Sequence, residues 1–152
     1  MRSVTRTLSL SVPPPQALSM KLDSHLWHTW VDGAQSPAQV EGDGGPGTVC
    51  MLNVRAAGLT EPYRIELEES ACDSSGGRYV ARVSTSAVRM KETWTFLPEG
   101  MGTRATWTFD YEPVGLTGFF LRPLLPSLLS RSMERSCRNF EALCKRASKG
   151  EV

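Results

Sequence analysis

The sequence predicts an α+β fold in which a curved, seven-stranded antiparallel sheet wraps around a long C-terminal helix. Two short helices follow the first strand in this prediction. Two observations carry it. Most of the chain alternates apolar and polar residues with a period of two, as strands with one buried face do. The last segment changes to a helical period, and its apolar face can cover the apolar face of the sheet.

The first strand is predicted over residues 4–12, where apolar residues alternate with Ser and Thr. Arg6 is the exception, because it occupies an inward position in that alternation. The three prolines at 13–15 end the strand, since proline donates no hydrogen bond to a sheet. Short helices are then expected at residues 16–20 and 22–31.

The remaining strands follow from the same alternation and are joined mainly by tight turns. They are expected at residues 39–43, 48–57, 63–68, 79–85, 90–96 and 105–111. The densest turn signal is the glycine-rich run at 44–47. After Pro126 the apolar residues recur every four positions, which predicts an amphipathic helix that ends around Lys149.

Composition narrows the functional classes. The chain has 152 residues, which suits one domain over residues 1–152. Its formal net charge of +1 creates no general field for nucleic acid or an anionic membrane. No segment resembles a signal peptide or is apolar enough to span a bilayer, so we expect a cytoplasmic protein. The four cysteines match no zinc or redox spacing and are expected to be free, buried thiols.

Several stretches of the chain resemble one known superfamily. Residues 40–48, VEGDGGPGT, resemble the glycine-rich loop of plant pollen-allergen and pathogenesis-related proteins, and the order of elements matches. Residues 92–111 and the run FFLRPL at 119–124 look more like the bacterial polyketide cyclase/dehydrase-like branch. Together they indicate the START-like, or helix-grip, superfamily (SRPBCC).

This resemblance implies a cavity between sheet and C-terminal helix that binds a hydrophobic small molecule. It implies either a cyclase or dehydrase acting on an aromatic or polyketide carbonyl compound, or a non-catalytic carrier or sensor of a lipid or aromatic ligand. Neither reading needs a metal or nucleotide cofactor. We expect no nucleic-acid partner, no stable membrane insertion, and a monomer or homodimer.

Glu92 is the strongest catalytic candidate. It falls on the apolar face of its strand, where a carboxyl group is desolvated unless a cation pairs with it. Arg6 and Tyr111 also have inward positions, and the hypothesis is that these three groups orient or protonate a carbonyl ligand. A structural ion pair, or a strand displaced in register, is the alternative for Glu92 and Arg6.

The remaining candidates are inward-facing residues that can line a cavity or fill a core. They are Leu8, Cys50, Leu52, Val54, Tyr63, Ile65, Tyr79, Val83, Met90, Trp94, Trp107, Phe109, Leu129 and Met133. Cys50 stands where some plant relatives carry an inward lysine. None of the four lysines here falls on an inward strand position, which argues against a lysine-dependent condensing mechanism.

Two other motifs are weak. The glycine loop lacks the Lys-Ser/Thr ending of a nucleotide-binding loop, and a strand should follow it, so a structural hairpin is favoured over a phosphate site. His25 and His28 have a spacing that could share a metal, but the sequence has no third histidine. Trp27 and Trp30 are expected to pack inward from the same short helix, leaving at least one histidine exposed.

Overall fold

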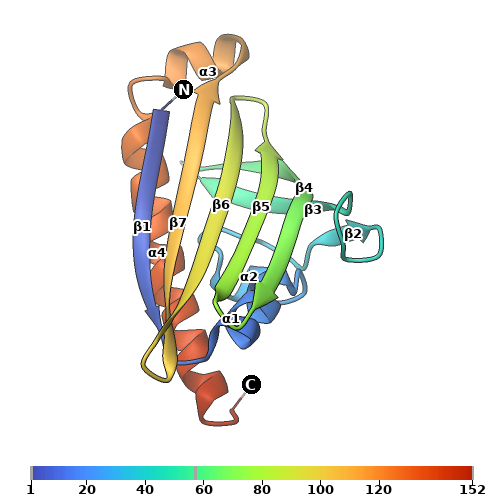
Figure 1. The fold of residues 1–152 in the computed structure, drawn as a ribbon. Coiled ribbons are helices and arrows are strands. Elements are labelled where there is room, and N and C mark those ends of the chain that lie inside the picture. The colour runs from blue at the N-terminus through green and yellow to red at the C-terminus, as the bar shows by residue number, and fades with distance from the viewer. Residues whose placement is uncertain (1, 57, 152) are drawn as a thin grey trace.

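A computed structural model describes residues 2–56 and 58–151 of the chain (Figure 1). Seven strands and four helices follow one another within these residues. The strands are β1 (Arg2–Leu10), β2 (Gln39–Glu41), β3 (Val49–Ala56), β4 (Leu59–Asp73), β5 (Gly76–Ser84), β6 (Val88–Glu99) and β7 (Gly102–Pro113). The helices are α1 (Pro14–Leu22), α2 (Trp27–Trp30), α3 (Gly115–Leu121) and α4 (Leu125–Ser148).

All seven strands form one antiparallel sheet in the order β1-β7-β6-β5-β4-β3-β2. The first strand in sequence pairs with the last, so β1 and β2 form the two edges. α4 runs along one face of the sheet and contacts β1, while α1 and α2 close that face beneath β4 and β5 (Figure 1). The predicted fold class, a sheet gripping a C-terminal helix, is confirmed.

Aromatic side chains fill part of the space between sheet and helix. The rings of Trp94 and Trp107 stack with centroids 4.8 Å apart, and Trp30 from α2 meets Trp94 edge-on at 6.0 Å. Phe140 of α4 contacts Trp30 with centroids 4.6 Å apart. Such pairs stabilise a core beyond the area that they bury. This cluster ties α2, β6, β7 and α4 together, and the cavity described below opens beside it.

The structure changes several predicted boundaries. α1 begins at Pro14 rather than at residue 16, because prolines suit the first helical turn, whose N–H groups need no partner in the helix. α2 is shorter than the expected helix, because the Asp23 carboxylate accepts a hydrogen bond from the His25 N–H and holds a turn before it. α3 was not predicted, and β4 is longer than expected, with a bulge between Leu67 and Glu69.

The expectation that all four thiols are buried was wrong for one of them. Cys50, Cys137 and Cys144 are buried, whereas Cys72 is exposed. Cys72 lies opposite Gly77 near the end of the β4–β5 hairpin, beyond the bulge and away from the core. Burial raises the pKa of Cys137 and of Cys144 to about 12 in each case.

This difference in exposure predicts that one thiol, that of Cys72, reacts much faster than the others. At pH 8 in native conditions, we expect Ellman's reagent to modify one cysteine per chain rapidly, since thiolate character and access govern the rate. A Cys72→Ser variant should lose that fast phase, and denaturant should restore reaction of the other thiols. A fast phase that persists in Cys72→Ser would contradict the buried positions of the other three.

Candidate cavity between the sheet and the C-terminal helix

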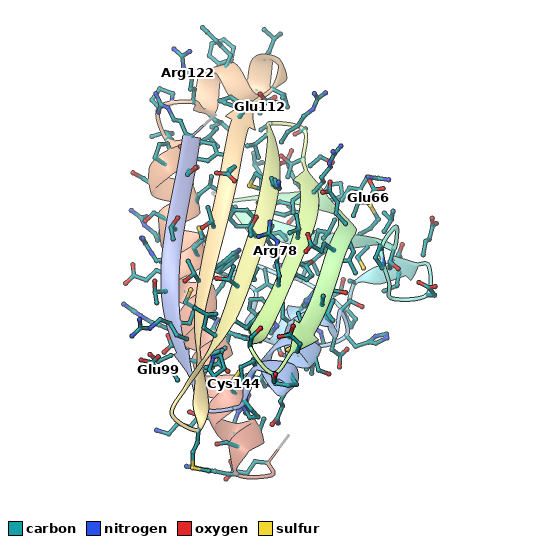
Figure 2. All side chains as sticks on the ribbon, in the orientation of Figure 1. Glu66, Arg78, Glu99, Glu112, Arg122 and Cys144 are labelled. Atoms are coloured by element: carbon teal, nitrogen blue, oxygen red, sulfur yellow. The ribbon has the colours of Figure 1, made fainter. Side chains whose placement is uncertain are left out.

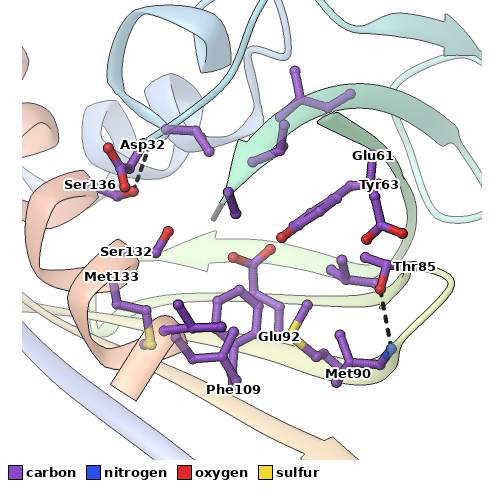
Figure 3. A pocket seen from close by; sticks show the side chains of 18 of the residues that line it. Asp32, Glu61, Tyr63, Thr85, Met90, Glu92, Phe109, Ser132, Met133 and Ser136 are labelled. Carbon is purple, nitrogen blue, oxygen red and sulfur yellow. Dashed lines mark hydrogen bonds between the residues drawn. The ribbon is translucent and has the colours of Figure 1, made fainter. Parts of the chain in front are cut away.

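A cavity of about 200 Å³ lies between the sheet and α4, and its wall is mainly apolar. Most of the residues expected to line a cavity do line this one. They are Leu52, Val54, Tyr63, Ile65, Val83, Met90, Glu92, Trp107, Phe109, Leu129 and Met133. Strands β3 to β7 supply one wall, and α4 supplies the facing wall (Figure 3).

The other candidates lie elsewhere. Leu8 and Trp94 are buried in the core and do not line the cavity. Cys50 and Tyr79 border a smaller hollow beneath the glycine-rich loop. Tyr111 is buried on β7 but does not reach the cavity.

The predicted partnership of Arg6 with Glu92 was also wrong. β1 is an edge strand that packs against α4, so the Arg6 guanidinium donates a hydrogen bond to the Ser130 hydroxyl of that helix. Arg6 does not line the cavity. Its inward position on the strand therefore serves the contact between sheet and helix.

Glu92 is the acid at the centre of the site. Its side chain projects from β6 on the apolar face and points into the cavity (Figure 3), and the residue is only 5% exposed. Oε1 accepts a hydrogen bond from Lys21 Nζ at 3.4 Å, and Oε2 accepts one from Trp94 Nε1 at 3.2 Å. Two donors therefore fix the orientation of the carboxylate.

Lys21 is the site residue that the sequence reasoning missed. It lies on α1, is 3% exposed, and its ammonium sits 4.2 Å from the Tyr79 ring centroid and 5.0 Å from that of Trp27. Burial lowers the pKa of Lys21, and the charge of Glu92 opposes that shift. Cation–π contacts and the ion pair offset part of the desolvation of the ammonium.

A signal for Lys21 was present in the sequence. Ala17 and Leu18 are buried on α1, and Lys21 follows them by four and three positions, which places it on the same helix face. The sequence prediction considered lysines on strands only, so a lysine that enters from a helix was overlooked. Only the tertiary structure shows that this helix face covers Glu92.

Tyr63 brings a phenol to the same place. Its hydroxyl points into the cavity from β4, on the side of the Glu92 carboxylate (Figure 3). Burial raises the pKa of Tyr63, and the nearby charge of Glu61 adds to the shift. The phenol therefore stays protonated at neutral pH and can donate a hydrogen bond. The Ser132 hydroxyl of α4 enters the cavity from the opposite wall (Figure 3).

Two donors in the cavity wall have no partner within the described part of the chain. These are the indole N–H groups of Trp30 and Trp107, which are both buried. A buried donor without a partner is uncommon in proteins and calls for an explanation.

The mouth of the cavity is marked by lining residues that remain exposed. Ala56 and Leu59 lie where β3 meets β4, and Thr117 lies on α3. α3 sits close to the β5–β6 turn, because a Cβ on Gly118 would stand 2.3 Å from the Ala87 carbonyl oxygen. A glycine at this position lets the helix reach the rim of the cavity.

The sheet, the gripped helix and the apolar cavity between them form the same fold as a solved START superfamily protein. The chain belongs to the family described as polyketide cyclase/dehydrase and lipid transport, whose sequence model matches residues 1–145. The resemblance stated from the sequence is thereby confirmed. No curated protein matches the chain significantly.

Several solved structures share this fold. A protein from Thermus thermophilus is 25% identical with a TM-score of 0.80, over 97% of this chain and 99% of that one. The Zhui aromatase/cyclase from Streptomyces sp. R1128 is 16% identical with a TM-score of 0.80, over 95% and 94%. A START superfamily protein from Mycobacterium smegmatis is 14% identical with a TM-score of 0.76, over 95% and 98%.

The described residues contain neither a membrane-spanning helix nor a metal cluster. None of the helices at 2–56 and 58–151 has the length and apolar character needed to cross a membrane. Within the same residues, no group of three or more His, Cys, Asp or Glu side chains could hold a metal ion. His25 and His28 are both exposed, while Trp27 and Trp30 pack inward as expected.

Proposed function

We propose that the cavity binds an aromatic or polyketide-type carbonyl compound and promotes its cyclisation or dehydration. One observation carries the proposal. An oriented carboxylate, Glu92, and a protonated phenol, Tyr63, both point into one mainly apolar cavity. The family to which the chain belongs includes cyclases and dehydrases by its description, which supports this reading.

In the proposed mechanism Glu92 acts as the general base. Its carboxylate removes a proton from the carbon beside a substrate carbonyl, and the Tyr63 phenol donates a hydrogen bond to the carbonyl oxygen as negative charge develops there. The resulting enolate carbon attacks a second carbonyl of the same molecule. The alkoxide formed by this attack takes the proton from Glu92 and becomes a hydroxyl group. The Glu92 carboxylate then removes the second proton from the attacking carbon and passes it to this hydroxyl group, which leaves as water.

The other residues of the site hold the substrate and the base in place. Lys21 lines the cavity beside Glu92 and is a positioning residue, because its ion pair fixes the Glu92 carboxylate. Trp107 and Phe109 offer a flat wall to a planar substrate. A substrate oxygen beside Trp107 would also give its unpaired indole N–H an acceptor. A cavity that imposes one folded geometry on a flexible chain supplies much of the catalysis by proximity. Since Arg6 and Tyr111 lie outside the cavity, they have no part in this mechanism.

Titration tests the ligand class. We expect a panel of aromatic polyketides and flavonoids to quench tryptophan fluorescence saturably, because Trp30 and Trp107 line the cavity. A Ser132→Phe substitution should fill the cavity and weaken binding at least about tenfold, since binding needs that volume. Ser127→Phe is the matched control, because Ser127 is exposed on the same helix and does not line the cavity. Equal affinity in both variants would place the ligand elsewhere.

A carrier without catalysis is the second candidate, and the mainly apolar wall of the cavity favours it. A carrier releases its ligand unchanged. Incubation of the best ligand with the protein, followed by chromatography and mass spectrometry of the recovered compound, separates the two functions, because a cyclised isomer keeps the mass of the ligand but changes its retention time. A mass loss of one water supports the dehydrating enzyme, whereas an unaltered compound from every member of the panel supports carriage.

The proposed location is the cytoplasm, and the unpaired state of all four cysteines supports it. A reducing compartment keeps such thiols free, and Cys72 in particular is exposed to any oxidant.

A further inference from the structure

Four large apolar side chains stand in solvent at the rim of the cavity. Leu116, Phe119, Phe120 and Leu124 are 78%, 60%, 73% and 56% exposed, and we name this group the apolar tip. They lie within nine consecutive residues of α3 and the turn that follows it. Large apolar side chains gathered on a protein surface commonly mark a site that contacts another protein or a membrane.

The apolar tip and the cavity wall share the helix α3. Leu116, Phe119 and Phe120 project outward from α3, while Thr117 and Leu121 of the same helix line the cavity. On the other side of the mouth, Leu59 also lines the cavity and is 67% exposed. Apolar surface therefore continues from the cavity wall, across its rim and onto the outside of the molecule.

The charges around the tip favour an anionic partner. Between Val114 and Met133 the sequence holds two arginines, Arg122 and Arg131, and no acid. Arg122 stands at the end of the molecule formed by α3 (Figure 2), with its guanidinium 5.7 Å from the Phe119 ring centroid. Two strand acids lie toward this end of the molecule. Glu112 lies opposite Arg89 on β6, and Glu61 accepts a hydrogen bond from Ser86 in the β5–β6 turn against which α3 packs.

We propose that the apolar tip docks on the surface of a phospholipid membrane that contains anionic lipid. The four apolar side chains enter the boundary between headgroups and acyl chains, and Arg122 contacts lipid phosphate. The mouth of the cavity then faces the membrane, and an apolar ligand passes between bilayer and cavity with little exposure to water. The docking is peripheral and reversible, since the tip is a short apolar element and not a spanning helix.

Vesicle co-sedimentation of the full chain tests the proposal. We expect binding to phosphatidylcholine vesicles containing roughly one third phosphatidylglycerol to exceed binding to pure phosphatidylcholine several-fold, and to weaken with salt. Phe119→Ser/Phe120→Ser should reduce the binding at least about tenfold, because two large apolar groups no longer enter the lipid. Arg122→Gln should remove the preference for anionic vesicles.

The matched control lies at the other end of the molecule. Leu97 and Met101 belong to the β6–β7 hairpin, are 53% and 95% exposed, and lie far from α3 (Figure 1). Leu97→Ser/Met101→Ser should bind vesicles as the unaltered chain does. Fluorescence titration with a cavity ligand, performed without vesicles, shows whether each variant keeps its fold and cavity, so loss of docking is distinguishable from failure of the proposed ligand binding.

Three outcomes overturn the proposal. The first is that the unaltered chain binds neither kind of vesicle. The second is that Phe119→Ser/Phe120→Ser binds vesicles as well as the control Leu97→Ser/Met101→Ser does. The third is a tip substitution that converts a dimer into a monomer in analytical ultracentrifugation while vesicle binding is absent, which would assign the tip to self-association. If Phe119→Ser/Phe120→Ser fails to fold, Leu116→Ser/Leu124→Ser serves as a second variant, because those two side chains are similarly exposed.

Discussion

Glu92→Gln should lower the turnover of the carbonyl substrate by about 10²–10⁴-fold, because an amide cannot accept the proton that the carboxylate removes. The affinity for that substrate should change only a few-fold, since Gln preserves the shape of the cavity wall. Steady-state and single-turnover rates measured alongside fluorescence titration separate the two effects. Unchanged turnover in this variant would contradict the proposed role of Glu92 as the general base.

The matched control for this variant lies on the same strand. Glu99 is exposed on β6, where it pairs with Arg104 rather than with a buried cation. Glu99→Gln should leave both turnover and affinity unchanged. Urea denaturation of both variants is needed, because removal of the Glu92 charge leaves Lys21 without its ion-pair partner. A variant that remains folded at the assay temperature keeps the kinetic comparison valid.

Lys21→Met should destabilise the protein by about 3–5 kcal/mol, because it leaves the buried Glu92 carboxylate without a counter-charge. The double variant Lys21→Met/Glu92→Gln should recover most of this loss, since neither buried charge remains. Urea denaturation of the unaltered chain, both single variants and the double variant gives the coupling energy as a double-mutant cycle. A cycle that shows no coupling would contradict the buried ion pair.

The pH dependence of the same cycle has a definite sign. Burial lowers the pKa of Lys21 in the folded chain below its ordinary value of 10.5. Between the lowered folded value and 10.5, the unfolded chain binds more protons at this residue than the folded chain does. The contribution of Lys21 to the free energy of unfolding therefore increases as pH rises through that window. The difference between the unaltered chain and Lys21→Met/Glu92→Gln isolates this contribution, because the buried thiols are common to both.

The sequence by itself determined the fold class and most of the cavity wall. Alternation with period two places side chains on a defined face of each strand, and a single buried face makes that placement reliable. Glu92, Tyr63 and Trp107 were assigned inward positions in this way, and all three line the cavity. The helical period after residue 124 placed Leu129 and Met133 on the facing wall for the same reason.

Only the tertiary structure decided which inward residues meet. A periodic pattern gives the face of a strand but not its position along the cavity, so Arg6 and Tyr111 were grouped with Glu92 although they lie outside the cavity. The true partner, Lys21, comes from a helix 71 positions away in sequence, and its approach depends on how α1 packs beneath β5 and β6. Long-range packing of this kind depends on the whole chain at once, whereas strand alternation depends only on neighbouring residues.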